Sequence, residues 1–160
     1  MNSPYCGKFR VTQIQHVSHD GLDLVGIDSK EIHATVSGVV RFAGWENPND
    51  HKQGFGQFVC IKGADGDFYY FGHLSKINVM AGDSVAITDV IGIEGSTGNS
   101  TGSHCHYCIR PAFAKGNEYN TTDRAGIPNA IGEYDDGYRP TNQVITRFEI
   151  NGVKYKIVKE

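Results

Sequence analysis

Two short clusters of His and Asp residues carry most of the chemistry that this chain of 160 residues offers. In the first, His104 and His106 are two positions apart, so on an extended strand both imidazoles point to the same face of a sheet. In the second, His19, Gly21 and Asp23 share one face if this segment is also extended. Gly21 has no side chain and would leave room for an ion between its neighbours.

Two imidazoles and one carboxylate are a common ligand set for catalytic zinc. They fill three positions of a tetrahedron and leave the fourth for water. The two clusters contain one His more than this set needs, and spacing alone does not say whether His104 or His106 binds the metal. The surplus imidazole is therefore a candidate catalytic group.

Three motifs follow one another along the chain: His-x-Gly-x-Asp at 19–23, Tyr-x-x-His-Leu-Ser at 70–75 and His-x-His at 104–106. A run rich in Gly, Ser and Thr at 91–102 precedes the third motif. In type and order these motifs resemble those of the lysostaphin-like zinc endopeptidases, metallopeptidase family 23, which cut peptide bridges in bacterial peptidoglycan. The resemblance covers roughly residues 8–111.

This resemblance implies a role for each of five residues. His19, Asp23 and His106 are expected to bind one Zn²⁺ per chain, and His73 and His104 to form an unliganded catalytic pair. His104 is the expected general base, because it lies two residues from ligand His106 on the same face. His73 would donate to the developing oxyanion, although the two roles could be exchanged.

The expected function is a zinc metalloendopeptidase that hydrolyses peptide cross-links of bacterial peptidoglycan. The alternative is a non-catalytic, zinc-containing domain on the same scaffold that binds the cell wall or regulates another protein. Loss of function in such a domain would show as missing ligands. All five positions are filled here, which favours the enzyme.

The sequence departs from the resemblance at Cys105 and Cys108, where the family usually has an aliphatic residue and an acid. Cys108 should lie on the face of the two imidazoles, so a thiol is expected near the metal, whereas Cys105 should point into the core. The Cys-x-x-Cys spacing also allows a structural zinc knuckle or a redox dithiol. A strand sends residues three apart to opposite faces, and no second Cys pair exists, so neither alternative is favoured.

The remaining histidines are expected to be structural or exposed. These are His16, His33 and His51, and His16 is the best reserve ligand among them.

Composition places the chain among small β proteins with one domain. Its 20 glycines, eight tyrosines and eight phenylalanines, with short Val and Ile runs between turn residues, favour strands. We find no convincing amphipathic helix of three turns. The net charge of −3 gives no general attraction to nucleic acid, to a membrane or to anionic wall polymers. The expected partner is therefore a peptidoglycan peptide held in a cleft, with a monomer favoured.

The fold that the resemblance implies is all-β and mainly antiparallel, a β sandwich or half-barrel of the duplicated hybrid motif type with an open groove. Strands are expected at 22–27, at 32–42 with a bend at a glycine, at 58–62 and 68–71 as a hairpin, and at 105–110. The run 95–103 is expected beside the cleft, or else as a simple connector.

We expect a single peptidase domain over residues 1–160, with its core at about 8–111. Residues 112–143 should form an irregular wrap that adds no chemistry. Residues 144–160 should form a terminal β-hairpin, because Asn151-Gly152 between alternating runs is a strong hairpin signal. The apolar face of that hairpin is expected to pack on the main sheet; the alternative is the stub of a truncated wall-binding module. Its residues are Phe148, Ile150, Val153, Tyr155 and Ile157.

The first residues, Met1 to Lys8, lack the apolar core of a signal peptide, and no run of eighteen apolar residues occurs. Synthesis in the cytoplasm is therefore expected, with action on the cell wall after release as a phage lysin or virion component. A chain that is a fragment of a longer exported protein would be secreted instead.

Overall fold

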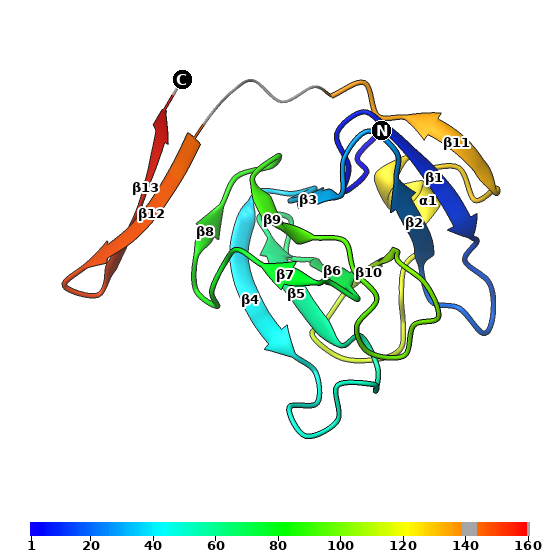
Figure 1. Cartoon of the computed structure of the whole chain (residues 1–160), viewed down its shortest axis with the longest axis horizontal. Helices are drawn as coiled ribbons and strands as arrows, with labels where there is room; N and C mark the ends of the chain where they lie inside the picture. The colour runs from blue at the N-terminus through cyan, green and yellow to red at the C-terminus, as the bar shows by residue number, and fades with distance from the viewer. Residues whose placement is uncertain (139–143, 160) are drawn as a thin grey trace.

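The computed structural model describes residues 1–138 and 144–159, and these residues form an almost entirely antiparallel β structure (Figure 1). The strands are β1 (Lys8–Gln13), β2 (Leu22–Gly26), β3 (Glu31–His33), β4 (Gly38–Trp45), β5 (Gln57–Gly63), β6 (Phe68–Gly72), β7 (Lys76–Ile77), β8 (Ser84–Val85), β9 (Val90–Ile93), β10 (Cys105–Arg110), β11 (Gly132–Asp135), β12 (Val144–Ile150) and β13 (Val153–Lys159). The helix α1 (Thr121–Ala125) is a single turn. The predicted fold class, all-β and mainly antiparallel, is confirmed.

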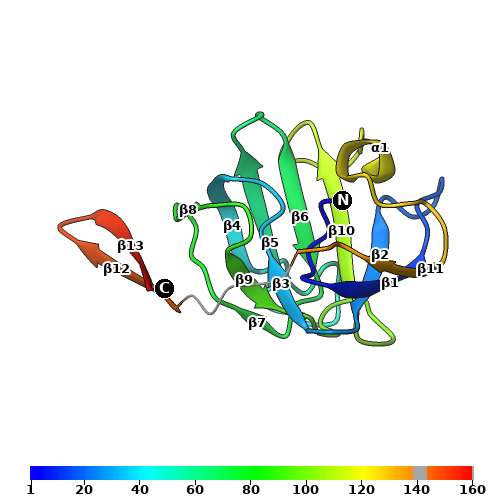
Figure 2. The ribbon, with the colours of Figure 1, turned by 90° about the horizontal axis from the view of Figure 1, so that it is seen from above.

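Eight strands form one large sheet in the order β11-β1-β2-β10-β6-β5-β4-β8. Figure 2 shows these strands side by side from β8 to β11. All of its neighbouring pairs are antiparallel. The strand β10 lies in the middle, between β2 and β6, so a side chain on β10 can meet side chains from both neighbours.

A second sheet of three strands, β3-β9-β7, packs against one face of the large sheet. The main core lies between them and joins Ile32 and Ile91 of the small sheet to Phe71 of the large one. Along β10, Tyr107 and Ile109 point into this core. The opposite face of β10, which carries His106, Cys108 and Arg110, is left to form the site.

The predicted strand at 32–42 is two strands rather than one bent strand. The strand β3 pairs with β9 in the small sheet, and β4 pairs with β5 in the large one. Between them, the backbone of Ala34 makes hydrogen bonds to the backbone of Thr88 and Asp89, which lie in the turn before β9, and not to a strand of either sheet. The chain therefore crosses from one sheet to the other at residues 34–37.

The region 112–143 was predicted to be irregular, which is partly wrong. It contains α1, which begins at the N-cap Asn120 and ends at Gly126, and it contains β11, which pairs with β1 at the edge of the large sheet. The strand β1 itself was not predicted. Gly132 and Tyr134 of β11 pair with Val11 and Phe9 of β1. No local sequence pattern predicts this pairing.

The terminal hairpin β12–β13 is present, with Asn151 and Gly152 both at positive φ in its turn. Its apolar face does not pack on the main sheet where the structure describes it, because Ile150, Val153 and Tyr155 are each about half exposed. Phe148 and Ile157 lie outside the residues whose side chains are described. The hairpin lies beside β8 in Figure 1, and Lys154 Nζ is 2.8 Å from the carbonyl oxygen of Ala81.

Across the described ranges 1–138 and 144–159, the structure contains no helix that is long and apolar enough to cross a membrane.

Candidate active site

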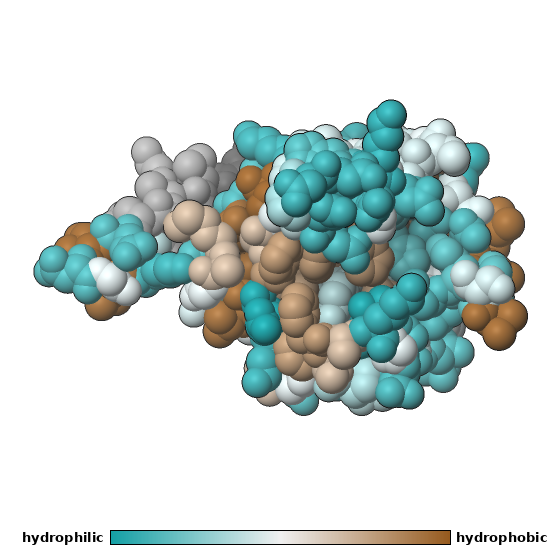
Figure 3. All heavy atoms as spheres, turned by 90° about the horizontal axis from the view of Figure 1, so that it is seen from below, coloured by the Kyte–Doolittle hydropathy of each residue, from teal (hydrophilic) through white to brown (hydrophobic). Residues whose placement is uncertain are grey.

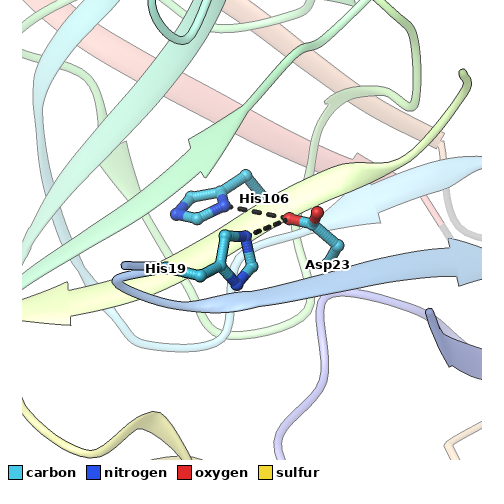
Figure 4. Close-up of side chains that lie close together, drawn as sticks. All are labelled: His19, Asp23 and His106. Atoms are coloured by element: carbon cyan, nitrogen blue, oxygen red, sulfur yellow. Dashed lines mark hydrogen bonds and ion pairs between the residues drawn. The ribbon is translucent and has the colours of Figure 1, made fainter. Parts of the chain in front are cut away.

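Asp23 on β2 stands directly opposite His106 on β10 in the sheet register. Asp23 Oδ1 lies 2.9 Å from His106 Nδ1 and 3.1 Å from His19 Nε2. Figure 4 shows that the three side chains converge from the two strands and from the loop before β2. The structure thus brings together the three residues that the sequence predicted as zinc ligands.

The route of the backbone into this cluster differs from the predicted extended segment. His16 and His19 bond to each other across a tight turn, the chain then bends at Gly21, and β2 begins only at Leu22. His19 therefore reaches Asp23 across a bend and not by alternation along a strand. Its Nδ1 atom lies 2.9 Å from the carbonyl oxygen of Ile14 and donates to it, which directs Nε2 toward Asp23.

Gly21 occupies a position where a side chain has no space. A Cβ atom there would lie 2.4 Å from the Tyr107 carbonyl oxygen, 2.8 Å from Cys108 Cβ and 3.0 Å from His106 Nε2. The bend thus passes directly over β10. The space that the missing side chain leaves is taken up by atoms of β10, and the expectation that Gly21 makes room for an ion stays a prediction.

The donor set fits Zn²⁺. One ligand atom from each of His19, Asp23 and His106 lies within 4.8 Å of the other two, and two imidazole nitrogens with one carboxylate are ligands that zinc prefers. The three side chains lie on the wall of a groove, so a fourth position can face solvent. The three side chains also contact one another directly, since Asp23 lies within hydrogen-bond distance of both His19 and His106.

The charges of the cluster are mutually stabilised. Burial opposes ionisation of Asp23, but hydrogen bonds from His106 and His19 outweigh it and hold its pKa well below the usual value. Burial likewise opposes a charge on His106, yet Asp20 and Asp23 together raise its pKa well above the usual value. The pKa of His19 is also raised, chiefly by Asp23 working against burial. Zinc would therefore compete with protons for the imidazole nitrogens of His19 and His106.

His73 and His104 lie together beside this cluster, as predicted. Their ring centroids are 4.6 Å apart, and His104 Nε2 is 3.7 Å from Asp23 Oδ1. The Nδ1 of His73 donates to the Thr97 carbonyl at 2.7 Å, and that of His104 donates to the Gly102 carbonyl at the same distance. In the neutral form each ring therefore keeps its lone pair on Nε2.

His73 directly follows the end of β6. Its φ of 63° lies in the left-handed region, which residues other than glycine rarely adopt. Its backbone N–H donates to the Phe55 carbonyl at 2.7 Å, which holds the strained conformation in place. Burial lowers the pKa of the His73 imidazole to about 4. The ring is therefore neutral at pH 7.

A groove of about 590 Å³ joins the predicted zinc ligands to the predicted catalytic pair. Besides the loop that carries His19, three loops line it, through Phe55 from the first, Asn99 to Thr101 from the second, and Lys115, Gly116 and Glu118 from the third. The run 95–103 thus lies beside the cleft, which was one of its two predicted placements. The third loop shows that the region after residue 111 does contribute to the groove.

Aromatic side chains cover the sheet next to this groove. Phe58 and Tyr70 are buried, Phe42 and Phe55 pack on them, and Phe113 stacks on Tyr70 with ring centroids 6.0 Å apart. Figure 3 shows apolar surface between hydrophilic lobes on one face of the molecule. An extended peptide could rest its backbone or small side chains on such a floor.

The sequence prediction missed an ionic group at the end of the groove. Asp20 Oδ1 is 2.8 Å from His106 Nε2, and Asp20 Oδ2 is 2.6 Å from Arg110 Nη2. Arg110 Nε is in turn 3.1 Å from Glu118 Oε1. His106 and Arg110 hold the pKa of Asp20 well below its usual value, although burial opposes this. Asp20 belongs to the first motif, but an extended segment would have pointed it away.

Cys105 and Cys108 take the predicted faces of β10. Cys105 lies in the main core, and Cys108 lies in the aromatic cluster on the side of His106. Both thiols are free and buried, and they lie on opposite faces of β10, which disfavours a metal or a disulfide shared between them. Burial raises the pKa of the Cys105 thiol.

The other three histidines have separate surroundings. His16 is exposed, with its ring centroid 5.8 Å from that of His19. His33 is buried and donates to the Thr88 carbonyl, and His51 stacks on Trp45. None of them lines the groove among the residues that the structure describes.

The family model of Peptidase family M23 matches residues 17–121, a range that contains all five predicted site residues. The DD-carboxypeptidase/endopeptidase Mpg of Neisseria meningitidis serogroup B is 35% identical over 112 residues, covering 69% of this chain and 24% of that protein. Lysostaphin of Staphylococcus staphylolyticus is 36% identical over 89 residues, covering 56% of this chain and 18% of that protein. The chain therefore spans about a quarter or less of these relatives.

Solved structures agree with the sequence matches. The catalytic domain of lysostaphin from Staphylococcus simulans superposes with a TM-score of 0.62 and 28% identity, over 75% of this chain and 92% of that one. The catalytic domain of a variant of the prophage-encoded M23 protein EnpA from Enterococcus faecalis gives the same TM-score and identity, over 74% of this chain and 94% of that one.

Proposed function

Because this chain belongs to peptidase family M23, we propose that it is a zinc-dependent endopeptidase that hydrolyses peptide cross-links of bacterial peptidoglycan. The observation that carries the proposal is the convergence of His19, Asp23 and His106 beside the pair His73 and His104 in one groove. The names of two similar proteins, the DD-carboxypeptidase/endopeptidase Mpg and the glycyl-glycine endopeptidase ALE-1 of Staphylococcus capitis, support a cell-wall peptide as the substrate.

His19, Asp23 and His106 would hold the zinc. When bound, zinc supplies Lewis-acid activation of a water molecule and of the scissile carbonyl. The chain itself supplies the groove, which holds an extended peptide across the site, and the two imidazoles that handle protons. The aromatic floor next to the groove would limit the access of bulk water to the reacting groups.

The hydrogen bonds of the catalytic pair bear on their roles. Each Nδ1 donates to a carbonyl, so each neutral ring offers Nε2 as a proton acceptor. His104 as the general base agrees with this arrangement. His73 is neutral at pH 7, so it would donate to an oxyanion only after it takes up a proton. We therefore propose that the proton accepted from water is passed within this pair and delivered to the leaving amine.

The test is hydrolysis of purified peptidoglycan by the zinc-loaded protein, with a chelator control and mass spectrometry of the new free amines. Release of amines that stops with the chelator and returns with added zinc would support the endopeptidase and name the bond that is cut. Tight zinc binding at one ion per chain with no release from any wall would contradict the proposal and favour the non-catalytic domain.

We further propose that the protein acts on the wall as a phage or prophage lysin. The similarity to the prophage-encoded protein EnpA supports this proposal. Producing the protein inside a susceptible bacterium, with and without permeabilisation of the cytoplasmic membrane, tests the direction of attack. Lysis only after permeabilisation is expected of an enzyme that is released to the wall from inside, and lysis without permeabilisation would contradict it.

A further inference from the structure

We propose that Asp20 is a positioning residue that fixes the orientation and the protonated nitrogen of ligand His106, an inference that rests on the proposed zinc site. Asp20 follows His19 directly and lies before β2 begins. Its two carboxylate oxygens point to different partners, Oδ1 to His106 at 2.8 Å and Oδ2 to Arg110 at 2.6 Å.

His106 needs a partner on the side away from the metal. Its Nδ1 atom faces Asp23, so the proton of a zinc-bound, neutral ring must reside on Nε2. The side chain is only 6% exposed, which leaves Nε2 little access to water. A ligand histidine usually donates its second N–H to a carboxylate or carbonyl, which sets the ring orientation.

Asp20 is the acceptor that stands in that place. The contact to Nε2 is a bent ion pair in the metal-free protein, and no group in the described ranges makes a better aligned hydrogen bond to this atom. Cys108 is the other polar neighbour, and a thiol is a weak acceptor compared with a carboxylate.

Arg110 holds the carboxylate from its other side. The guanidinium is buried, is fixed by Glu118 at 3.1 Å and lies over the ring of Tyr70 at 4.5 Å. Asp20 is thereby tied to the groove wall while it contacts His106. The chain of contacts runs from Glu118 through Arg110 and Asp20 to the metal ligand.

The same atoms allow a rival interpretation. Asp20, His106 and Cys108 also offer one ligand atom each within 4.8 Å, so they could hold a second metal ion. The guanidinium of Arg110 already neutralises Asp20, and Cys108 has no exposed surface. These two facts favour the positioning role, and the metal stoichiometry separates the two interpretations.

The test compares zinc affinities of the wild type, Asp20→Asn, Asp20→Ala and Glu133→Gln, each measured by competition with a chromophoric chelator. Glu133→Gln is the matched control, since it removes a carboxylate that pairs with Arg10 at the exposed edge of the large sheet and lies outside the groove lining. We expect both Asp20 variants to bind zinc roughly 10- to 100-fold more weakly, and the control to stay within about threefold of wild type. The visible spectrum of the Co²⁺ form should also change in the Asp20 variants alone.

Unchanged zinc affinity and Co²⁺ spectrum in both Asp20 variants would overturn the inference, as would an equal loss in Glu133→Gln. Two zinc ions per wild-type chain, with one lost in Cys108→Ser, would overturn it in favour of the second metal site. A wild-type protein that binds no zinc would instead contradict the proposed function itself. Thermal unfolding of each variant checks that the fold is kept, and Asp20→Asn preserves the size of the side chain.

Discussion

Asp23 joins the two halves of the proposed zinc site, because its Oδ1 atom contacts His19 and His106 at about equal distances. We expect Asp23→Ala and His106→Ala to lose zinc and peptidase activity together. His104→Ala should keep one zinc per chain and lose turnover by roughly 10²- to 10⁴-fold, as expected for removal of a general acid-base group. Metal analysis and peptidoglycan assays on the same preparations measure both quantities.

His16→Ala is the control for this series. The residue is the reserve ligand of the sequence interpretation, but it is exposed and lies outside the groove lining. It should keep both zinc and activity. Retained hydrolysis in His104→Ala would remove that residue from its role as base, and loss of zinc in His16→Ala would revise the ligand set.

His73 makes the stability of the metal-free protein depend on pH. Its pKa is about 4 in the folded protein and 6.5 as an ordinary imidazole, so between these values the unfolded chain binds more protons. Stability attributable to His73 is therefore full above pH 6.5 and falls as the pH drops toward 4. In His73→Gln, the decrease in Tm over this interval should be smaller than in the wild type. Equal decreases in the two proteins would show that this imidazole does not titrate abnormally.

At the scale of elements, the antiparallel pairing of β2 with β10 is the feature that the motifs predict least directly. The sequence predicted β10 and the faces of His106 and Cys108 correctly, because strict alternation holds along a central strand. It predicted His19 and Asp23 as partners through the resemblance. It could not place Asp20, since alternation fails at the bend before β2 and only the long-range pairing with β10 shows where that side chain points.

Edge elements were the weakest part of the prediction for a similar reason. More than a hundred residues separate β1 from its partner β11. In β11, Glu133 and Tyr134 are not part of an alternating pattern of apolar and polar residues that would predict a strand. The split of β3 from β4 also depends on which sheet each half joins. Local patterns identify strands, whereas the choice of partner is decided by packing between distant segments.

Gly21 is where the bend and β10 meet, which makes it a test of this geometry. In Gly21→Ala the new methyl group would collide with the Tyr107 carbonyl and with Cys108 Cβ, so the loop must move away from His106. We expect a loss of about 1–3 kcal/mol in the free energy of unfolding, together with weaker zinc binding. Chemical denaturation and chelator competition measure the two effects.

Gly102→Ala is the matched control for this substitution. Gly102 has no heavy atom within 4 Å of an added Cβ, and its φ is not in the left-handed region. It should therefore unfold at nearly the wild-type denaturant concentration and keep its zinc affinity. If Gly21→Ala behaved in the same way, the close approach of the bend to β10 would be wrong.

At the scale of the whole molecule, the large sheet has a separate use for each face. One face is closed by the three-stranded sheet and holds the main core, which gives the ligand-bearing strands a rigid support. The other face carries the aromatic cluster and the groove. This division lets His106 and Tyr107, which are neighbours in sequence, serve the site and the core respectively.

The hairpin β12–β13 stands apart from both faces, and this predicts how the protein responds to its removal. Lys154 joins it to the turn before β8, through the Ala81 carbonyl and an ion pair with Asp83 at 3.5 Å. Lys154 is partly exposed in this pair whereas Asp83 is buried, and a single pair of this kind is expected to contribute roughly 1 kcal/mol. Ile150 and Val153 remain half exposed.

A chain that ends after Tyr138 should therefore unfold within about 4 °C of the full chain and bind zinc with unchanged affinity. It should also be more soluble, because it no longer exposes the apolar side chains of the hairpin. Differential scanning calorimetry and chelator competition on both proteins test this expectation, with Lys154→Ala as the control for the ion pair alone. A shortened chain that fails to unfold cooperatively would show that the hairpin stabilises the peptidase core. A shortened chain with unchanged Tm but weaker hydrolysis of whole walls would assign the hairpin to substrate binding.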